Sequence, residues 1–82
     1  MSRLIYEPIK VHQDKDSKIT AFIWRRRLYR VLEILDQWRE PAEWWNEEET
    51  RLYFRVTAKN SSTGVYELCQ IGNEWFLSRV LD

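Results

Sequence analysis

The stretch RLYFRVTAKNSSTGVYELCQIGNEWFLSRVL, residues 51–81, decides the fold class. It contains three runs rich in β-branched and aromatic residues, which are the residues that strands favour. Two small polar turns separate these runs: NSSTG at 60–64, with a glycine able to take positive φ, and Gly72-Asn73. Short turns between strand-like runs predict a three-stranded antiparallel meander over residues 51–82. The expected strands are 51–59, 65–71 and 74–81.

The preceding stretch contains one clear strand and one ambiguous segment. Residues 19–24 (ITAFIW) have strand composition. Residues 28–40 (LYRVLEILDQWRE) place Leu28, Val31, Leu32 and Leu35 at the i, i+3, i+4 and i+7 spacing of a helix, and they alternate less cleanly with the period of a strand. Spacing alone therefore favours a helix by a small margin, which a proline after residue 40 would end.

The remaining segments are a terminal strand and two polar loops. Residues 1–12 are apolar in places and interrupted by Pro8, which suits an edge strand because proline cannot donate a ladder hydrogen bond. Residues 13–18 (QDKDSK) indicate an exposed loop. Residues 41–50 (PAEWWNEEET) indicate an irregular acidic loop carrying two tryptophans. A chain of 82 residues is expected to form one domain.

The order of these landmarks resembles a known family. The chain runs FIWRRRLYRV (22–31), LDQWRE (35–40), WWNEEETRLYFRV (44–56) and GVYELCQIGNEWFLSRVLD (64–82). The pattern is similar to a small bacterial domain of unknown function, found free-standing and as the C-terminal tail of ImuB-like Y-family polymerase homologues, accessory proteins of translesion synthesis. The similarity covers about residues 19–82. One departure is that Arg25 and Arg26 stand where the family usually offers a glycine.

The resemblance implies a fold but supplies no activity. It implies a β-rich domain, so residues 28–40 become a long, bent strand and residues 19–40 a hairpin before the meander. With the N-terminal strand, this gives a mainly β fold of five or six antiparallel strands, an SH3-like or partly closed barrel. The whole of residues 1–82 is then a single small β domain.

Composition narrows the function classes. Thirteen basic and thirteen acidic residues give zero net charge, which lowers the expectation of strong non-specific nucleic-acid binding. There is no apolar run of membrane-spanning length and no secretory leader, so we expect no membrane association. The single cysteine cannot form an internal disulfide or a cysteine-based zinc site, which favours a reducing, cytoplasmic setting. We expect no metal and no cofactor.

No catalytic constellation is visible. His12 has no cysteine or carboxylate at ligand spacing, so an exposed structural role is favoured over general-base catalysis. Cys69 lies in an expected strand, which favours a buried, inert thiol over a nucleophile. The protein is therefore not expected to be an enzyme.

The tryptophan pair of the acidic loop is the first candidate binding feature. Adjacent residues on an extended segment point to opposite sides, so one of Trp44 and Trp45 is expected to face solvent or a partner. With Glu43 and Glu47 around it, an exposed tryptophan suits a protein-binding hot spot. The alternative is that both indoles fold over the core. Plain core positions are expected for Trp38, Trp75 and Phe76.

An arginine cluster is the second candidate, and it leads to a different function. Arginine beside aromatic rings on a β surface can hold single-stranded nucleic acid, with rings stacking on bases and arginines contacting phosphates. The alternative is a solvated hairpin tip with its rings facing inward. The residues concerned are Arg25, Arg26, Arg27, Arg30, Trp24 and Tyr29.

Two function hypotheses follow from these features. The first, narrowly favoured, is a non-enzymatic protein-interaction module, binding a polymerase or repair component in a DNA-repair or translesion-synthesis assembly. The second is a weak nucleic-acid-binding barrel. A homodimer is a further option, since an edge strand and surplus tryptophans are available.

Overall fold

The computed structural model describes residues 3–40 and 50–81, and every regular element in these ranges is a strand. The prediction of a mainly β, antiparallel fold is therefore confirmed. In chain order the strands are β1 (Arg3–Gln13), β2 (Ile19–Trp24), β3 (Arg27–Glu40), β4 (Arg51–Lys59), β5 (Thr63–Ile71) and β6 (Glu74–Leu81).

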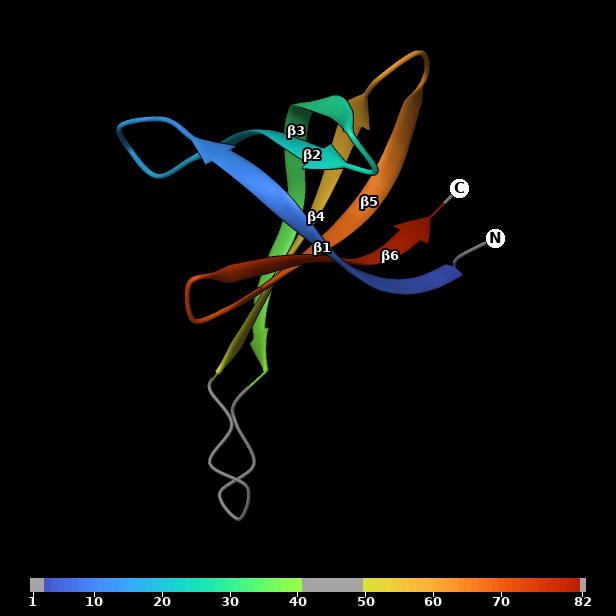
Figure 1. Ribbon diagram of the computed structural model, residues 1–82. Coiled ribbons are helices and arrows are strands. Elements are labelled where there is room, and N and C mark those ends of the chain that lie inside the picture. Colours follow the sequence, from blue (N-terminus) through green and yellow to red (C-terminus); the bar gives the residue numbers. More distant parts are fainter. Residues whose placement is uncertain (1–2, 41–49, 82) are drawn as a thin grey trace.

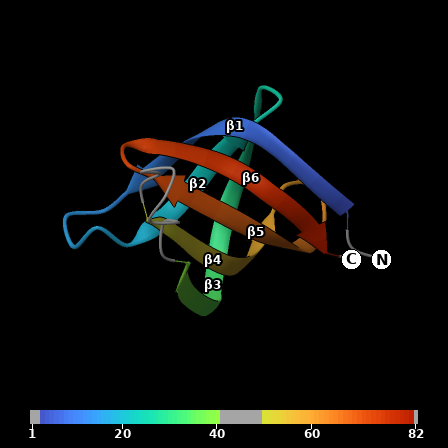
Figure 2. The same cartoon turned by 90° about the horizontal axis from the view of Figure 1, so that it is seen from below.

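The strands form a closed antiparallel barrel in which each strand pairs with its neighbours in sequence (Figure 1). The first strand closes the barrel by pairing with the last, with Arg3 opposite Val80 and Ile9 opposite Trp75. In the view from below, β1 and β6 run side by side across the molecule (Figure 2). Closure matters because a closed sheet has fewer unpaired edges to aggregate with other chains.

Among the described residues there is no helix with the length and hydrophobicity needed to cross a bilayer.

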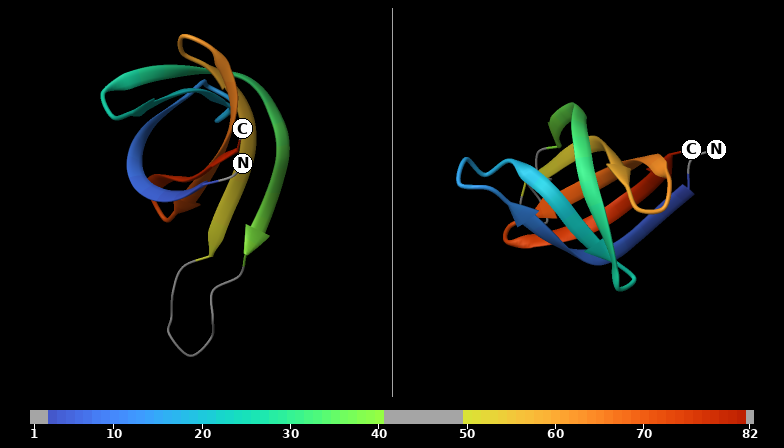
Figure 3. Two further views of the ribbon diagram at one scale, coloured as in Figure 1. Left: turned by 90° about the vertical axis from the view of Figure 1, so that its right-hand side faces the viewer. Right: turned by 90° about the horizontal axis from the view of Figure 1, so that it is seen from above.

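Strand β3 is where spacing and structure disagree. The helix favoured by spacing alone is wrong, and the long, bent strand implied by the resemblance is confirmed: β3 curves over one end of the barrel (Figure 3). Its register with β4 shifts at Leu32 and again at Leu35, as at β-bulges, which insert an extra residue and bend a strand. Two insertions change the interval between inward-facing residues from two to three. The bulges therefore give this part of β3 a spacing close to the period of a helix, about 3.6 residues.

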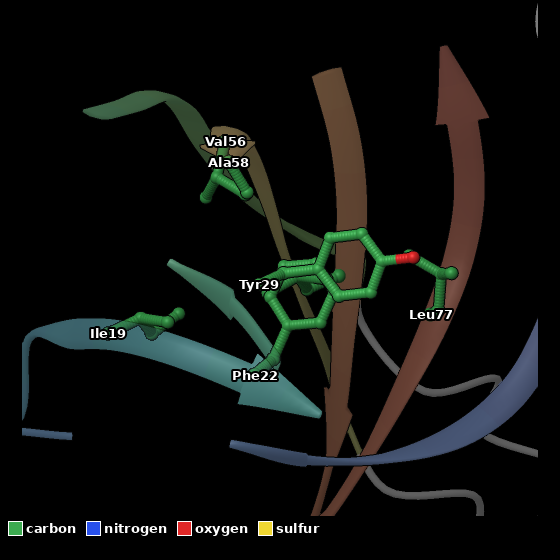
Figure 4. Packing of buried hydrophobic residues seen from close by; sticks show 7 residues of the cluster. Ile19, Phe22, Tyr29, Val56, Ala58 and Leu77 are labelled. Carbon is green, nitrogen blue, oxygen red and sulfur yellow. The ribbon is translucent and has the colours of Figure 1, made fainter. Parts of the chain in front are cut away.

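The barrel interior is built around two rings. Phe22 is fully buried, and its ring stacks on that of Tyr29 with centroids 5.0 Å apart (Figure 4). The edge of Tyr66 contacts both rings. Aliphatic side chains from β2, β4, β5 and β6 complete the cluster: Ile19, Val56, Ala58, Leu68 and Leu77.

A second buried cluster lies on the outer face of the sheet. Phe54 and Leu68 pack in the interior, so their chain neighbours Tyr53 and Cys69 point outward, and these are buried as well. The Trp38 ring stacks on Tyr53 with centroids 5.4 Å apart. Trp38 was predicted as plain core but belongs to this outer layer, whereas Trp75 packs against the interior cluster as expected.

Candidate interaction surface

The predicted tryptophan hot spot lies outside the described residues. This holds for its four residues, Glu43, Trp44, Trp45 and Glu47. The surface described below is therefore built from the barrel itself, and the role of the tryptophan pair stays a prediction.

One arginine of the cluster differs from the others because it forms an ion pair within the chain. Arg25 makes an ion pair with Glu7, its Nη2 2.8 Å and its Nε 3.1 Å from the two carboxylate oxygens. Its guanidinium also lies 4.6 Å from the Trp24 ring centroid. The Trp24 indole N–H donates to the same carboxylate at 2.9 Å. The hydrogen bond from Arg25, and then the one from Trp24, hold the pKa of Glu7 below its ordinary value.

The two rings assigned to base stacking are also engaged. Tyr29 is buried against Phe22 and Tyr66, and Trp24 is half-buried beside Tyr29 with its ring covered by Arg25. Base stacking requires an open ring face, whereas Tyr29 is buried and Arg25 lies over the Trp24 ring. All four arginines of the cluster are exposed, and Arg26, Arg27 and Arg30 remain besides Arg25, which is paired with Glu7.

The turn between β2 and β3 places two arginines in left-handed backbone conformations. Trp24 pairs with Arg27, so Arg25 and Arg26 are the whole turn, with φ of 52° and 66°. Two-residue hairpin turns of this kind normally use Asn-Gly, because side chains are strained at positive φ. The hairpin is therefore tight even without a glycine, but its backbone is strained at Arg25 and Arg26.

This strain gives a stability prediction. We expect Arg26→Gly to raise the free energy of unfolding by about 0.5–1 kcal/mol, since glycine relieves the strain and Arg26 is exposed. Arg25→Gly relieves similar strain but removes the contacts to Glu7 and Trp24, so it is expected to gain less or to lose stability. Thermal unfolding followed by circular dichroism compares the two. Equal gains would contradict the role assigned to Arg25.

Strand β3 exposes three leucines. Leu28 is 53%, Leu32 54% and Leu35 46% accessible to solvent. These residues supply three of the four positions in the apparent helical pattern, while Val31 packs against the core with Ile34. Because large apolar side chains this exposed are rarely clustered on a protein without a partner, β3 is the clearest candidate docking element in the described residues.

Two of these leucines line a shallow, open groove. Its walls are Leu28, Arg30 and Leu32 of β3, Lys59 of β4, and Asn60 and Ser61 of the following turn. The Asn60 amide donates to the Leu28 carbonyl oxygen at 2.9 Å, which fixes this turn beside β3. An adjoining groove on the β2 side shares the β3 residues and includes Asp14 and Glu33.

Cross-strand pairing distributes charge unevenly over the outer faces. At one end of the barrel, Asp36 is opposite Arg55, Arg55 opposite Glu67, and Glu67 opposite Arg79, so acid and base alternate across four strands. At the other end, Arg30 is directly opposite Lys59. Like charges in directly opposed positions repel one another.

The comparisons place the chain in a family. A family model described as "Domain of unknown function (DUF6504)" matches residues 1–82. The chain belongs to this family. No curated protein and no solved structure matches it. Membership agrees with the resemblance to a small domain of unknown function and assigns no partner or reaction.

Two side chains of this family member that could react, those of Cys69 and Tyr53, are buried. Cys69 is buried, and burial raises the pKa of its thiol, which disfavours the nucleophilic thiolate. Burial and a 2.7 Å hydrogen bond between the Tyr6 and Tyr53 hydroxyls raise the pKa of Tyr53. Residues 3–40 and 50–81 bring together no group of three or more side chains able to hold a metal ion.

Sequence reasoning did not identify the exposed leucines of β3, or the neighbouring Lys59, as candidate binding residues. The four positions of the helical pattern were read only as evidence on secondary structure, and no face was assigned to the leucines. A signal was present, because a strand reading of residues 28–40 cannot bury Leu28, Leu32 and Leu35 together without bulges. In a strand without bulges, Leu28 and Leu32 lie on one face and Leu35 on the other, so at least one of the three would face away from the core.

Proposed function

We propose that this domain is a non-enzymatic protein-interaction module whose docking surface includes β3. The observation that carries the proposal is the exposure of Leu28, Leu32 and Leu35 on one strand. In the described residues, the one other exposed large aliphatic side chain is Leu4 of β1. Burying such side chains against a partner is favourable by about 25 cal/mol per Å² of apolar surface.

Side-chain chemistry favours protein over nucleic acid as the partner class. Leucines bury well against apolar protein side chains, whereas single-stranded nucleic acid is held by open aromatic rings. The rings nearest the arginine cluster, those of Trp24 and Tyr29, are packed against other groups. Of the six residues proposed for nucleic-acid binding, Arg26, Arg27 and Arg30 are the ones outside these packed contacts.

The cellular context of the proposal comes from the sequence resemblance. Because the chain resembles the tails of ImuB-like polymerase homologues, the proposed partner is a polymerase or repair component in the cytoplasm. Trp44 and Trp45, with Glu43 and Glu47, are proposed as a further contact. A homodimer is the other protein partner to be considered.

Site-specific photo-crosslinking tests the module directly. We expect a benzophenone amino acid in place of Leu32 to give discrete protein adducts in the native cells. The same group in place of Lys15, an exposed residue of the β1–β2 loop, is the matched control and is expected to give none. An adduct of twice the chain mass would identify a homodimer.

Two outcomes would contradict the proposal. One is the absence of Leu32-specific protein adducts. The other is adduct formation with nucleic acid, accompanied by binding of labelled single-stranded DNA that weakens steeply with salt and is lost in Arg26→Glu. That second result would establish the alternative, a nucleic-acid-binding barrel.

A further inference from the structure

We propose that the groove between β3 and the β4–β5 turn binds an acidic peptide segment with apolar anchors. The acidic groups lie against Arg30 and Lys59, and the apolar side chains lie against Leu28 and Leu32. This deepens the proposed function, on which it rests for a protein partner, by naming the chemistry of that partner.

The like-charged pair is the first observation. Arg30 and Lys59 are cross-strand partners, so their Cβ atoms are about 4.5–5.5 Å apart. None of the six residues that line the groove is acidic. A carboxylate between the two cations would accept hydrogen bonds from both and remove their mutual repulsion, and such charge-assisted hydrogen bonds are the stronger kind.

The opposite end of the barrel shows how this chain neutralises charge when the partner is internal. There Glu67 lies between Arg55 and Arg79, with carboxylate-to-guanidinium distances of 3.6 and 3.7 Å. The same cross-strand geometry at Arg30 places Ala21 on one side and Lys59 on the other. An anion that neutralises Arg30 and Lys59 is therefore expected to come from another molecule.

The residues that pair with Arg30 in turn across the neighbouring strands form a row, and every member of this row is basic or neutral. Pairing continues from His12 to Ala21, Arg30, Lys59 and Thr63, so no carboxylate occurs in it. The adjoining groove toward β2 does include Asp14 and Glu33. An acidic segment is therefore expected on the Lys59 side of Arg30, away from these two carboxylates.

Apolar contacts select a peptide over other anions. Leu28 and Leu32 share the groove with Arg30, and both are about half exposed. Phosphate alone would satisfy the cations but leave both leucines in water. A segment that carries both acidic and aliphatic side chains satisfies both parts of the groove. The Ser61 hydroxyl at the rim of the groove could hydrogen-bond to the backbone of the bound segment.

Fluorescence anisotropy with defined peptides tests the inference. The probe is fluorescein-labelled Asp-Asp-Leu-Glu-Glu-Leu-Asp-Asp, compared with one peptide whose acids are lysines and another whose leucines are serines. We expect the acidic leucine peptide to bind at least about tenfold more tightly than either, the scale of one charge-assisted hydrogen bond or one buried side chain. Amide shifts in NMR spectra are expected to map to Leu28, Leu32 and Asn60.

Paired charge reversals supply the control. Lys59→Glu is expected to weaken acidic-peptide binding about tenfold or more, whereas Lys15→Glu makes the same charge change in the exposed β1–β2 loop and is expected to have little effect. Circular dichroism checks that both variants fold, and Arg30→Gln is a milder second variant.

Three outcomes would overturn the inference: no preference for the acidic peptide, equal losses in the two reversals, or tight binding of single-stranded DNA in place of the peptide. Protein adducts at Leu32 without acidic-peptide binding would overturn this inference and leave the proposed module intact.

Discussion

Replacing Phe22 by alanine is expected to cost about 3–5 kcal/mol in the free energy of unfolding. The side chain is fully buried, stacks on Tyr29 and meets the edge of Tyr66, so its removal leaves a cavity at the centre of the barrel. Small domains are stable by only about 5–15 kcal/mol in total. The variant is therefore expected to be partly unfolded at ordinary temperature or to melt far below the wild type.

Leu32→Ser is the matched comparison for Phe22→Ala. Leu32 is about half exposed, so its loss is expected to change the free energy of unfolding by no more than about 1 kcal/mol. Urea denaturation followed by tryptophan fluorescence measures both variants. A large loss in Leu32→Ser with a small one in Phe22→Ala would mean that the inward and outward faces of the barrel have been assigned the wrong way round.

The second large effect is expected at Glu67. This buried carboxylate accepts a hydrogen bond from the Ser78 hydroxyl at 3.2 Å and lies between Arg55 and Arg79. Glu67→Ala leaves the hydroxyl without this acceptor and removes the negative charge between two arginines, which lie on the strands on either side of β5. We expect a loss of about 1–3 kcal/mol, discounted for the solvent that screens the part-exposed arginines.

Glu33→Ala is the control for Glu67→Ala. Glu33 is an exposed β3 carboxylate opposite Thr57, so its removal is expected to change stability by less than about 0.5 kcal/mol. Chemical denaturation of the two variants at neutral pH gives the comparison. Equal effects would show that the alternating charges contribute through net charge alone and not through their arrangement across the strands.

The C-terminal half of the fold was predictable because its signals agree with one another. Strand composition, a glycine-containing turn and regular alternation all indicate the same meander, and β4 and β5 pair without a register shift. Phe54 and Val56, two residues apart in β4, both face the interior, as strand alternation requires. What alternation could not show is that the outward face would bury Tyr53 and Cys69 as well, since that depends on side chains brought together from β1 and β3.

The two bulges of β3 could not be predicted from the sequence pattern, for a physical reason. A bulge is defined by the partner strand, because only the register with β4 identifies Leu32 and Leu35 as extra residues. Until the partner is known, three leucines at helical spacing are equally consistent with one face of a helix.

The candidate surface was only partly predictable from local sequence. The exposure of Arg26, Arg27 and Arg30 follows from their hairpin position, but two interactions that decide the site are long-range. Glu7 reaches Arg25 from another strand, and Lys59 becomes the neighbour of Arg30 only when β3 pairs with β4. Residues so far apart in the chain leave no local signature.

The pairing of β1 with β6 also has a kinetic consequence. Arg3 and Val80 lie near the two ends of the described chain, so their pairing is a contact of very high sequence separation. Proteins dominated by such contacts fold in milliseconds to seconds, whereas local hairpins form in microseconds. We therefore expect the β4–β5–β6 meander to assemble early and the pairing of β1 with β6 to complete the ring last. Until then the side chains destined for its interior are open to water and to other chains, so the time before closure is when the protein is most vulnerable to aggregation.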